Sequence, residues 1–432
     1  MNPITDKHAG TLLFSFILLL ASLTPAMAEE PLPGEPLTDE HAQKIFDLAM
    51  EERDDGKVYD AIEKFEYILS RRPSLNRARL ELAVSYHRAS QYEKALQEFQ
   101  TVLDDPETPE KVRLAILAYL GQLTSDELKP QYENNFSYYT KAGLLYNTNI
   151  NFAPLRGSEI YNVPDGEDTA SPGLDTFFSA SHQYRDNKPF NTDGAATLFE
   201  WQSQISWTGN NYTRNSDYSV NIISASTGPA FISTGRWRGA ISLQVDQTFF
   251  GQSVLGTFVS LNPLVTFDLG NYRGITLEAS YMNNDYSRSA DLGRDGHSVL
   301  AGAAYSTLLG GVENGIETGF RFTDQTADDA QYGFNSAEIY FGGFVAAGKD
   351  SNVYLNLNFL QFDYDAADSI SGNVRDEIES RYQLGYNWDI SEGALAGWTL
   401  NSYFSYTKNN SNVDFYNYDR KIIAVNLARY FL

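Results

Sequence analysis

The residues best suited to chemistry in this sequence are its histidines and its clustered carboxylates. The five histidines are far apart along the chain: His8, His41, His87, His182 and His297. None stands within metal-ligand spacing of another. Two acidic runs stand out: Asp324, Asp328 and Asp329, and Asp363, Asp365 and Asp368. Carboxylates at such density could bind calcium, but neither run has the spacing of a calcium loop. We therefore interpret them as a solvated rim at strand ends and loops, and expect no metal.

Enzyme motifs are missing from the sequence. It contains no Gly-x-Ser-x-Gly, no phosphate-binding loop and no His-Glu-x-x-His. With no Cys, it can form neither disulfides nor thiolate metal sites, and it has no cysteine nucleophile. We expect no enzyme and no cofactor; the alternative is a lipase or protease triad assembled from distant strands.

Charge and aromatic content narrow the class of protein further. The net charge of −24 argues against nucleic acid, which is bound through Lys and Arg. Aromatic residues make up 14% of the chain, with 28 Tyr and 26 Phe. Outer-membrane β-barrels carry such residues in girdles at both membrane interfaces. The composition thus favours a membrane barrel over a nucleic-acid-binding protein.

The first 28 residues have the features of a secretory signal peptide. Lys7 precedes an apolar run over 12–23, and Ala26-Met27-Ala28 offers a small-x-small cleavage site. The run is shorter than the roughly 20 residues of a spanning helix. No Cys follows the cleavage site, so the chain is not expected to be a lipoprotein itself.

Hydrophobic periodicity changes near residue 130 and divides the rest of the chain. After a linker at 29–37, apolar residues recur at helical spacing over 38–130. Over 131–432 they recur every second position, as in strands. The sequence predicts an α + β membrane protein: a helical domain followed by a transmembrane antiparallel β-barrel.

The helical part contains an internal repeat of 34 residues. Ala61-x-x-x-Phe65 recurs as Ala95-x-x-x-Phe99, and Leu48-Ala49 as Leu82-Ala83. This pattern resembles the tetratricopeptide repeat, a helix–turn–helix unit whose small Ala lets two helices approach closely. We predict two stacked repeats with a third helix, 110–120, as a cap.

One face of the first helix in each repeat is expected to line a groove for a peptide or a barrel rim. By register its residues are Gln43, Phe46, Met50, Arg53, Arg77, Leu80, Val84 and His87. The alternative is that some of these side chains pack between the helices.

Strict alternation over long segments predicts the strands of the barrel. On 353–359, Val353, Leu355 and Phe359 share one face, whereas Asn356 and Asn358 share the other. A soluble β-sandwich also alternates. Strands of about a dozen residues, against a globular mode of about 5–6, favour a membrane barrel instead. So do charged inner faces and loops that alternate long and short.

The alternation of long and short loops gives the strand number. Counting back from a last strand at 418–431 gives 14 strands, with 12 or 16 as alternatives, and a first strand at 136–146. An even strand number requires one more strand within 147–194, and 174–184 is the only candidate. The connection at Gly251 is short although it should be an outer loop. The final residues, Tyr430, Phe431 and Leu432, are expected to be the insertion signal read by the barrel assembly machinery.

A short segment after the predicted first strand carries a family resemblance. Gly143-Leu144-Leu145-Tyr146 leads into Asn147-Thr148-Asn149-Ile150-Asn151-Phe152-Ala153-Pro154. This resembles the surface lipoprotein assembly modifier (Slam) family, which joins an N-terminal tetratricopeptide domain to a 14-stranded barrel. The resemblance implies an outer-membrane location, lipoprotein or secreted protein cargo, and no catalytic residues. Asn147–Asn151 is either a polar rim that satisfies backbone groups, or a clamp or lateral gate beside the last strand.

Three functions are compatible with these features. The first is an outer-membrane translocator whose periplasmic repeats receive cargo and whose barrel passes it outward. The second is a passive porin or polysaccharide-export channel. The third is a structural anchor that recruits a periplasmic partner to a plugged barrel.

Overall fold

The computed structural model describes residues 37–106, 108–114, 116–117, 120, 134–152, 169–186 and 188–431. The predicted signal peptide, most of the linker, Pro154 and Leu432 lie outside these residues. The helices are α2 (Asp39–Asp54), α3 (Val58–Arg71), α4 (Asn76–Arg88) and α5 (Tyr92–Asp104). Residues 110–114, within the predicted cap, are also helical.

Two antiparallel helix pairs share one apolar core. Phe65 and Phe99, at equivalent repeat positions, are at most 1% exposed, and Ala61 and Ala95 are fully buried. The Ala side chains leave room for the close approach of the helices, and the Phe rings fill the space between them. The sequence repeat therefore corresponds to a structural repeat; its assignment to the tetratricopeptide type stays a prediction.

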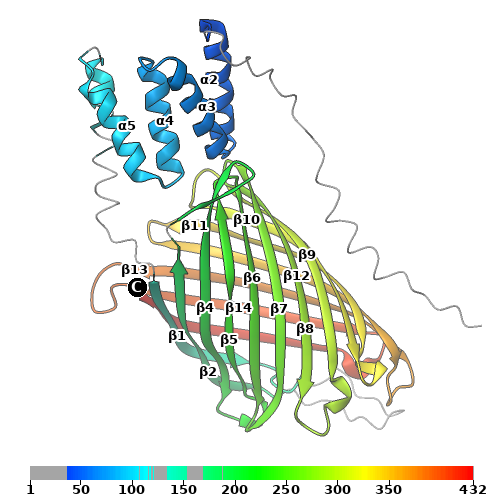
Figure 1. Ribbon diagram of the computed structural model, residues 1–432. Coiled ribbons are helices and arrows are strands. Elements are labelled where there is room, and N and C mark those ends of the chain that lie inside the picture. The colour runs from blue at the N-terminus through cyan, green and yellow to red at the C-terminus, as the bar shows by residue number, and fades with distance from the viewer. Residues whose placement is uncertain are drawn as a thin grey trace, which may run out of the picture.

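The rest of the chain forms one closed antiparallel sheet (Figure 1). Its strands are β1 (Asn134–Asn147), β2 (Ser171–Arg185), β3 (Phe190–Thr192), β4 (Ala195–Tyr212), β5 (Val220–Ser233), β6 (Trp237–Phe250), β7 (Ser253–Gly270), β8 (Arg273–Tyr286), β9 (Gly296–Leu308), β10 (Gly315–Ala327), β11 (Phe334–Gly348), β12 (Ser351–Ala367), β13 (Val374–Ile390), β14 (Trp398–Ser411) and β15 (Tyr418–Phe431). Strands that are consecutive in the chain pair with each other, except that β2 pairs with β4 instead of β3; β1 pairs with β15.

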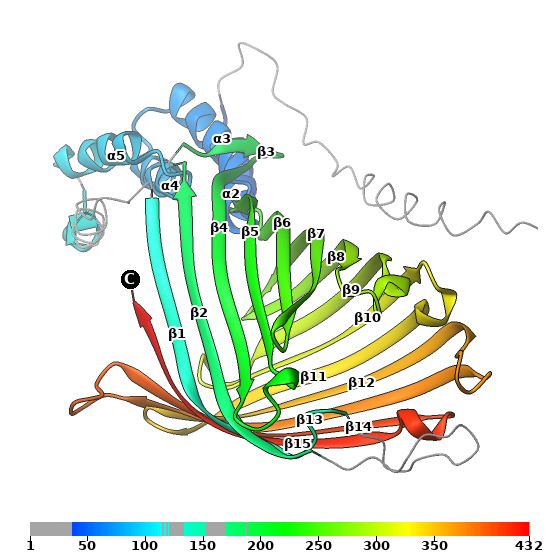
Figure 2. The same ribbon diagram turned by 90° about the horizontal axis from the view of Figure 1, so that it is seen from below.

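The ring contains fourteen strands, because the short β3 pairs only with 195–197 at the start of β4, just before the part of β4 that pairs with β2. This confirms the predicted fold class and strand number. The strand that parity placed at 174–184 is β2, and the short connection at Gly251 joins β6 to β7. Figure 2, seen from below, shows the strands following one another around the curved wall.

Two strands continue into polar segments, β4 to Tyr212 and β14 to Ser411. These strand ends are rich in Asn, a residue typical of turns. Here hydrogen bonds between paired strands satisfy the Asn side chains: Asn221 Nδ2 donates to Asn211 Oδ1 at 2.9 Å. Polar strand ends therefore extend the barrel beyond its apolar band.

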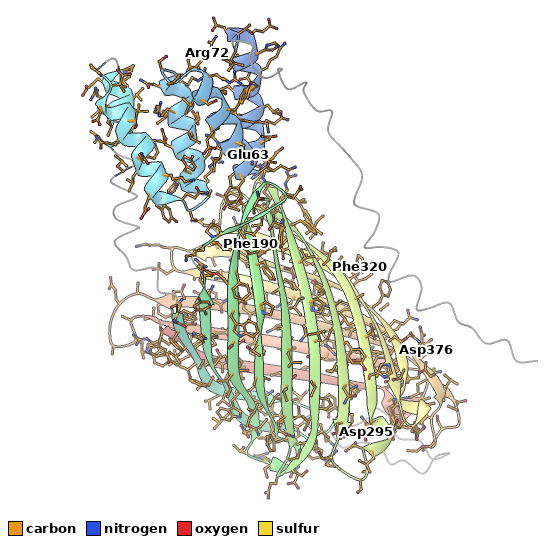
Figure 3. The ribbon with its side chains drawn as sticks, viewed as in Figure 1. Glu63, Arg72, Phe190, Asp295, Phe320 and Asp376 are labelled. Atoms are coloured by element: carbon orange, nitrogen blue, oxygen red, sulfur yellow. The ribbon has the colours of Figure 1, made fainter. Side chains whose placement is uncertain are left out.

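The two faces of the wall differ in polarity. Large apolar side chains such as Ile378, Leu384 and Phe320 are about half exposed on one face, as lipid-facing residues are when no lipid is present. Figure 3 marks Phe320 midway along the wall and Asp295 and Asp376 at the end away from the helices. The opposite face carries hydrogen-bonded polar residues and faces the lumen. Among the described residues, no helix is long and apolar enough to cross a membrane.

The helical domain lies at one end of the barrel, here called the helix-side end (Figure 1). The turn between α2 and α3 contacts the turn between β5 and β6. Thr234 Oγ1 donates to the carbonyl of Gly56 at 2.7 Å, and the Arg236 guanidinium donates to the carbonyl of Asp54 at 2.5 Å. The second carbonyl lies at the C-terminal end of α2, where a cation is favourable.

A second contact joins α3 to the β3–β4 hairpin. The Tyr59 amide donates to the carbonyl of Gly194 at 2.8 Å. Gly56 and Gly194 both have positive φ, +84° and +80°. A Cβ on Gly56 would lie 1.7 Å from the Thr234 carbonyl oxygen, and one on Gly194 2.2 Å from Asp60 Oδ2. The glycines therefore let the two parts of the chain meet backbone to backbone.

Candidate functional site at the barrel seam

The seam is the junction between the first and last strands of the barrel. β1 and β15 pair antiparallel from Tyr138 opposite Phe431 to Asn147 opposite Ile422. This junction joins the two ends of the barrel sequence, so no hairpin turn connects its strands. Its closure depends on backbone pairing and on the side chains that cross it.

The motif singled out in the sequence lies at the seam's far end, away from the helices. Thr148 and Lys421 pair in both directions: the Thr148 amide donates to the Lys421 carbonyl, and the Lys421 amide donates to Thr148 Oγ1, each at 3.0 Å. Asn149 Nδ2 donates to the carbonyl of Asp419 at 3.0 Å. The segment therefore extends the pairing of β1 with β15 past the end of β1.

The same motif also contacts the other side of β1. Asn147 Nδ2 donates to Tyr212 Oη of β4 at 2.7 Å, and Asn147 Oδ1 accepts from the Asn149 amide at 3.0 Å. Asn147 and Asn149 are fully buried, and Ile150 is 3% exposed. Asn151 Oδ1 accepts from the Thr169 amide at 3.1 Å. These contacts satisfy backbone groups and connect the segment after β1 to β15 and β4; its role as a rim, a clamp or a lateral gate stays a prediction.

A second polar connection crosses the seam in the lumen. Asn426 of β15 donates through Nδ2 to Asp175 Oδ2 of β2 at 3.0 Å, passing over Gly143 of β1. Lys141 Nζ also lies 3.0 Å from Asp175 Oδ2. Asn426 is 1% and Asp175 4% exposed, so the hydrogen bond is shielded from water. We call Asn426, Gly143, Asp175 and Lys141 the seam lock.

Gly143 makes this geometry possible. A Cβ there would lie 2.1 Å from the Val425 carbonyl oxygen and 2.3 Å from Asn426 Oδ1. Sequence reasoning did not identify the seam lock. An isolated Gly inside a strand often marks close approach by another group, and Gly143 was a clue of this kind. Its partners are 32 and 283 positions away, so only the barrel's closure brings them together.

The two predicted acidic runs lie at the far end, on the last residues of β10 and β12 and in the loops that follow, but Asp368 is 5% exposed and is not solvated as expected. Asp368 Oδ1 accepts from the amides of Ile370 and Ser371 at 3.0 and 2.8 Å, and Tyr416 Oη donates to Asp368 Oδ2 at 2.6 Å. The Arg375 guanidinium lies 3.7 Å from the ring centroid of Tyr364 and 4.1 Å from that of Tyr416. Among the described residues, no group of three or more His, Asp or Glu could hold a metal ion.

Hydrogen bonding sets the charge state of this rim. Burial alone would raise the pKa of Asp368, but the Tyr416 hydroxyl and the loop amides outweigh it and hold that pKa below its usual range. Burial, together with the same hydrogen bond, raises the pKa of Tyr416. The carboxylate therefore stays an acceptor and the phenol a donor at neutral pH.

The predicted groove residues differ in their accessibility. Phe46 is 6% and Arg53 7% exposed. The Arg77 guanidinium lies 4.5 Å from the Phe46 ring centroid, and Arg53 forms an ion pair with Glu81. Met50, Leu80 and Val84 pack against the core, Gln43 donates to Asp47 at 2.6 Å, and His87 lies beside Tyr92. Partner contact by this set stays a prediction, and Phe46 and Arg53 already have partners within the domain.

The end of the chain lies at the helix-side end of the seam. Tyr430 is 57% and Phe431 41% exposed. The Arg429 guanidinium lies 5.0 Å from the Phe431 ring centroid and 5.7 Å from that of Trp398. Aromatic and basic residues together are typical of a membrane interface. Recognition of Tyr430, Phe431 and Leu432 by an assembly machinery stays a prediction.

The expected family resemblance is confirmed over the C-terminal part of the barrel. A sequence model of the family described as "Surface lipoprotein assembly modifier" matches residues 275–431. The closed barrel, its apolar outer face and this match together define an outer-membrane β-barrel protein of a Gram-negative bacterium. No curated protein sequence matches the chain.

Solved outer-membrane barrels give low-scoring structural matches. OccK1 from Pseudomonas aeruginosa is 11% identical, with a TM-score of 0.36 over 68% of this chain and 98% of that one. An anion-selective porin from Comamonas acidovorans is 9% identical, with a TM-score of 0.39 over 69% and 99%. The loop-deleted OmpT of Vibrio cholerae is 9% identical, with a TM-score of 0.36 over 69% and 100%.

Proposed function

We propose that this protein is an outer-membrane translocator that helps surface lipoproteins or related secreted proteins cross the outer membrane. The observation that carries the proposal is the match to the surface lipoprotein assembly modifier family over residues 275–431. The structural arrangement is consistent with that role: a helical domain is hydrogen-bonded to one end of a barrel wide enough to hold a lumen.

The proposed topology places the helices in the periplasm. In outer-membrane barrels the short turns are periplasmic and the long loops are outside. The turns at 234–236 and 271–272 lie at the helix-side end, and the longer connections at 287–295 and 412–417 lie at the other. The helical domain, including the groove predicted from Gln43 to His87, would therefore meet exported cargo before it reaches the barrel.

Surface exposure of a candidate lipoprotein tests the proposal. The lipoprotein encoded beside this chain's gene would be expressed with and without the chain, and intact cells would be treated with protease. We expect the lipoprotein to be degraded only when the chain is present. Equal degradation of every candidate in both strains would contradict the proposal. A chain lacking 38–130 tests the docking role, because it should insert but deliver less cargo.

A porin is the second candidate, favoured by the hydrophilic inner wall. A cavity of about 810 Å³ near the helix-side end is bordered by Asn352, Asn356, Glu317 and Ser306. Conductance of the purified chain in a planar bilayer separates the two functions. A large, permanently open conductance would favour the porin, whereas a closed or rarely opening barrel would favour the translocator.

A further inference from the structure

The inner wall near the helix-side end contains a polar cavity of about 540 Å³. It lies where β12, β13, β14, β15 and β1 adjoin, so it spans the seam. Its lining combines tyrosines with primary amides, namely Tyr139, Tyr354, Tyr403, Gln383, Asn387 and Asn401, among others. A cavity of this size is within the range of small-ligand sites.

An aromatic row crosses the cavity. Tyr354 of β12 and Tyr403 of β14 line the cavity, with Gly385 of β13 between them in register. Phe344 of β11 is the register partner of Tyr354 on the other side and lies just outside the lining. A Cβ on Gly385 would lie 2.1 Å from Tyr354 Cζ and 2.4 Å from Cε1. The Tyr354 ring therefore occupies the side-chain space at Gly385 and lies against the wall. The other face of the ring is directed at the lumen.

Amide side chains border this row on both sides. Two residues toward the helix-side end, Asn352, Asn387 and Asn401 form a hydrogen-bonded ladder: Asn387 Nδ2 donates to Asn352 Oδ1 at 3.1 Å, and Asn401 Nδ2 donates to Asn387 Oδ1 at 2.6 Å. Two residues toward the far end, Asn356 and Gln383 are register partners. A primary amide has two N–H donors and two acceptor lone pairs, so the ladder leaves donors and acceptors for a ligand.

The tyrosine hydroxyl is held in place by the same amides. Tyr354 Oη accepts from Asn401 Nδ2 at 3.3 Å and from Gln383 Nε2 at 3.5 Å. The ring cannot rotate freely without losing these bonds. The surface is therefore ordered before any ligand arrives, which lowers the entropy lost on binding.

The charges at the cavity are balanced. Lys141 pairs with Asp175, and Asp389 accepts from Thr399 Oγ1 at 2.6 Å. Among the described residues that line the cavity, Lys141 is one cation, Asp389 is one anion, and Ala428 is the one aliphatic residue. An ionic ligand would gain little from such a surface, and the apolar area open to a ligand is mainly that of the tyrosine rings.

We propose that this surface binds a neutral saccharide chain. A pyranose ring has an apolar C–H face and a rim of hydroxyls that both donate and accept. The aromatic row fits the apolar C–H face, and the bordering amides fit the hydroxyls. A translocating polypeptide would share the amide contacts, but its aliphatic side chains would meet few apolar groups beyond the tyrosine rings. The assignment goes beyond the translocator function and does not depend on it.

Calorimetric titration of the purified full chain with maltohexaose and cellohexaose tests the proposal. We expect saturable binding of at least one of them. Tyr354→Ala and Asn401→Ala should each weaken sugar binding about tenfold, because the first removes an aromatic ring of the row and the second removes an amide that borders it. Tyr354→Phe keeps the ring and should retain most of the affinity.

Tyr340→Ala is the matched control. Tyr340 is also a lumen-facing tyrosine that lies over a glycine: a Cβ on Gly319 would lie 2.6 Å from Tyr340 Cζ. Unlike Tyr354, it lies outside the cavity. Heat-dependent gel migration would show that every variant forms the barrel. The proposal is overturned if neither sugar binds the native chain, or if Tyr340→Ala weakens binding as much as Tyr354→Ala. Binding of an extended neutral peptide in place of both sugars would also overturn it and assign the surface to a polypeptide.

Discussion

Asn426 reaches Asp175 across an intervening strand, and this is possible only because position 143 has no side chain. The hydrogen bond thus links β15 to β2 directly, while Lys141 holds the same carboxylate from β1. The three strands at the seam are connected through one buried Asp. Removing Asp175 would leave the buried Asn426 amide without its acceptor, and an unsatisfied buried polar group costs about 1–3 kcal/mol.

Gly143→Ala should destabilise the barrel, because the new Cβ would lie 2.1 Å from a backbone oxygen and 2.3 Å from Asn426 Oδ1. Overpacking of this kind costs about 1–3 kcal/mol. The measurement is the urea midpoint of unfolding in lipid vesicles, which should fall. Gly274→Ala is the control, since a Cβ there would meet its nearest atoms at 3.5 Å and should leave the midpoint unchanged. Equal midpoints for both variants would show that Gly143 does not support the seam.

Asp368 should make the far-end loop sensitive to acid. Its pKa is depressed, so its stabilising effect is fully present above the unfolded value of about 3.9 and is lost as the pH falls through the lower folded pKa. A spin label on Ser369→Cys, in a chain with no other Cys, should stay ordered at neutral pH and become mobile only as acid protonates Asp368 through its lowered pKa. In Asp368→Asn the label should be more mobile at neutral pH, with no acid transition of this kind. An acid transition of the same size in this variant would assign the effect to another group.

At the scale of elements, the fold was predictable to the extent that it depends on local periodicity. Alternation identified most strands, and the 34-residue repeat identified the helix pairs. The strand β2 has little periodicity of its own, and only the parity of the barrel located it. The seam lock and the aromatic row were beyond sequence reasoning, because register between strands depends on how the barrel closes. Neither Asn426 with Asp175 nor Tyr354 with Gly385 shows any local pattern.

The junction between helices and barrel should be rigid in the native chain and loose in the Thr234→Ala/Arg236→Ala double variant. The variant loses two hydrogen bonds to the α2–α3 turn, each worth about 0.5–1.5 kcal/mol. Spin labels on Lys44→Cys and Glu392→Cys report the distance between the two parts, and its distribution should broaden. Arg273→Ala, at a neighbouring turn where Arg273 bonds only to local carbonyls, is the control and should keep it narrow. A narrow distribution in the double variant would mean that the remaining contacts with the β3–β4 hairpin, such as the Tyr59 amide with the Gly194 carbonyl, are enough to hold the domain.

At the scale of the whole molecule, the seam is where the barrel can open with least rearrangement. Opening elsewhere would separate strands that a turn holds together, whereas β1 and β15 end at opposite termini of the barrel sequence. The far-end motif and the seam lock would both have to separate. If cargo passes through this junction, fixing it covalently should stop transport while leaving the barrel intact.

A disulfide across the seam tests this. Leu144 and Val425 are register partners on β1 and β15, and Ser402 and Val425 are register partners on β14 and β15. Cysteines at directly opposed positions are close enough to bridge. Both pairs share Val425→Cys, so the control fixes the other side of β15 from the same residue. Oxidised Leu144→Cys/Val425→Cys should reduce surface delivery of the lipoprotein about tenfold. This corresponds to an increase of about 1.4 kcal/mol or more in the barrier to transport. Adding a reductant should restore delivery. Oxidised Ser402→Cys/Val425→Cys should deliver normally.

Normal delivery through both oxidised barrels would mean that cargo crosses without opening the seam, and the lumen or the neighbouring lipid would then be its route.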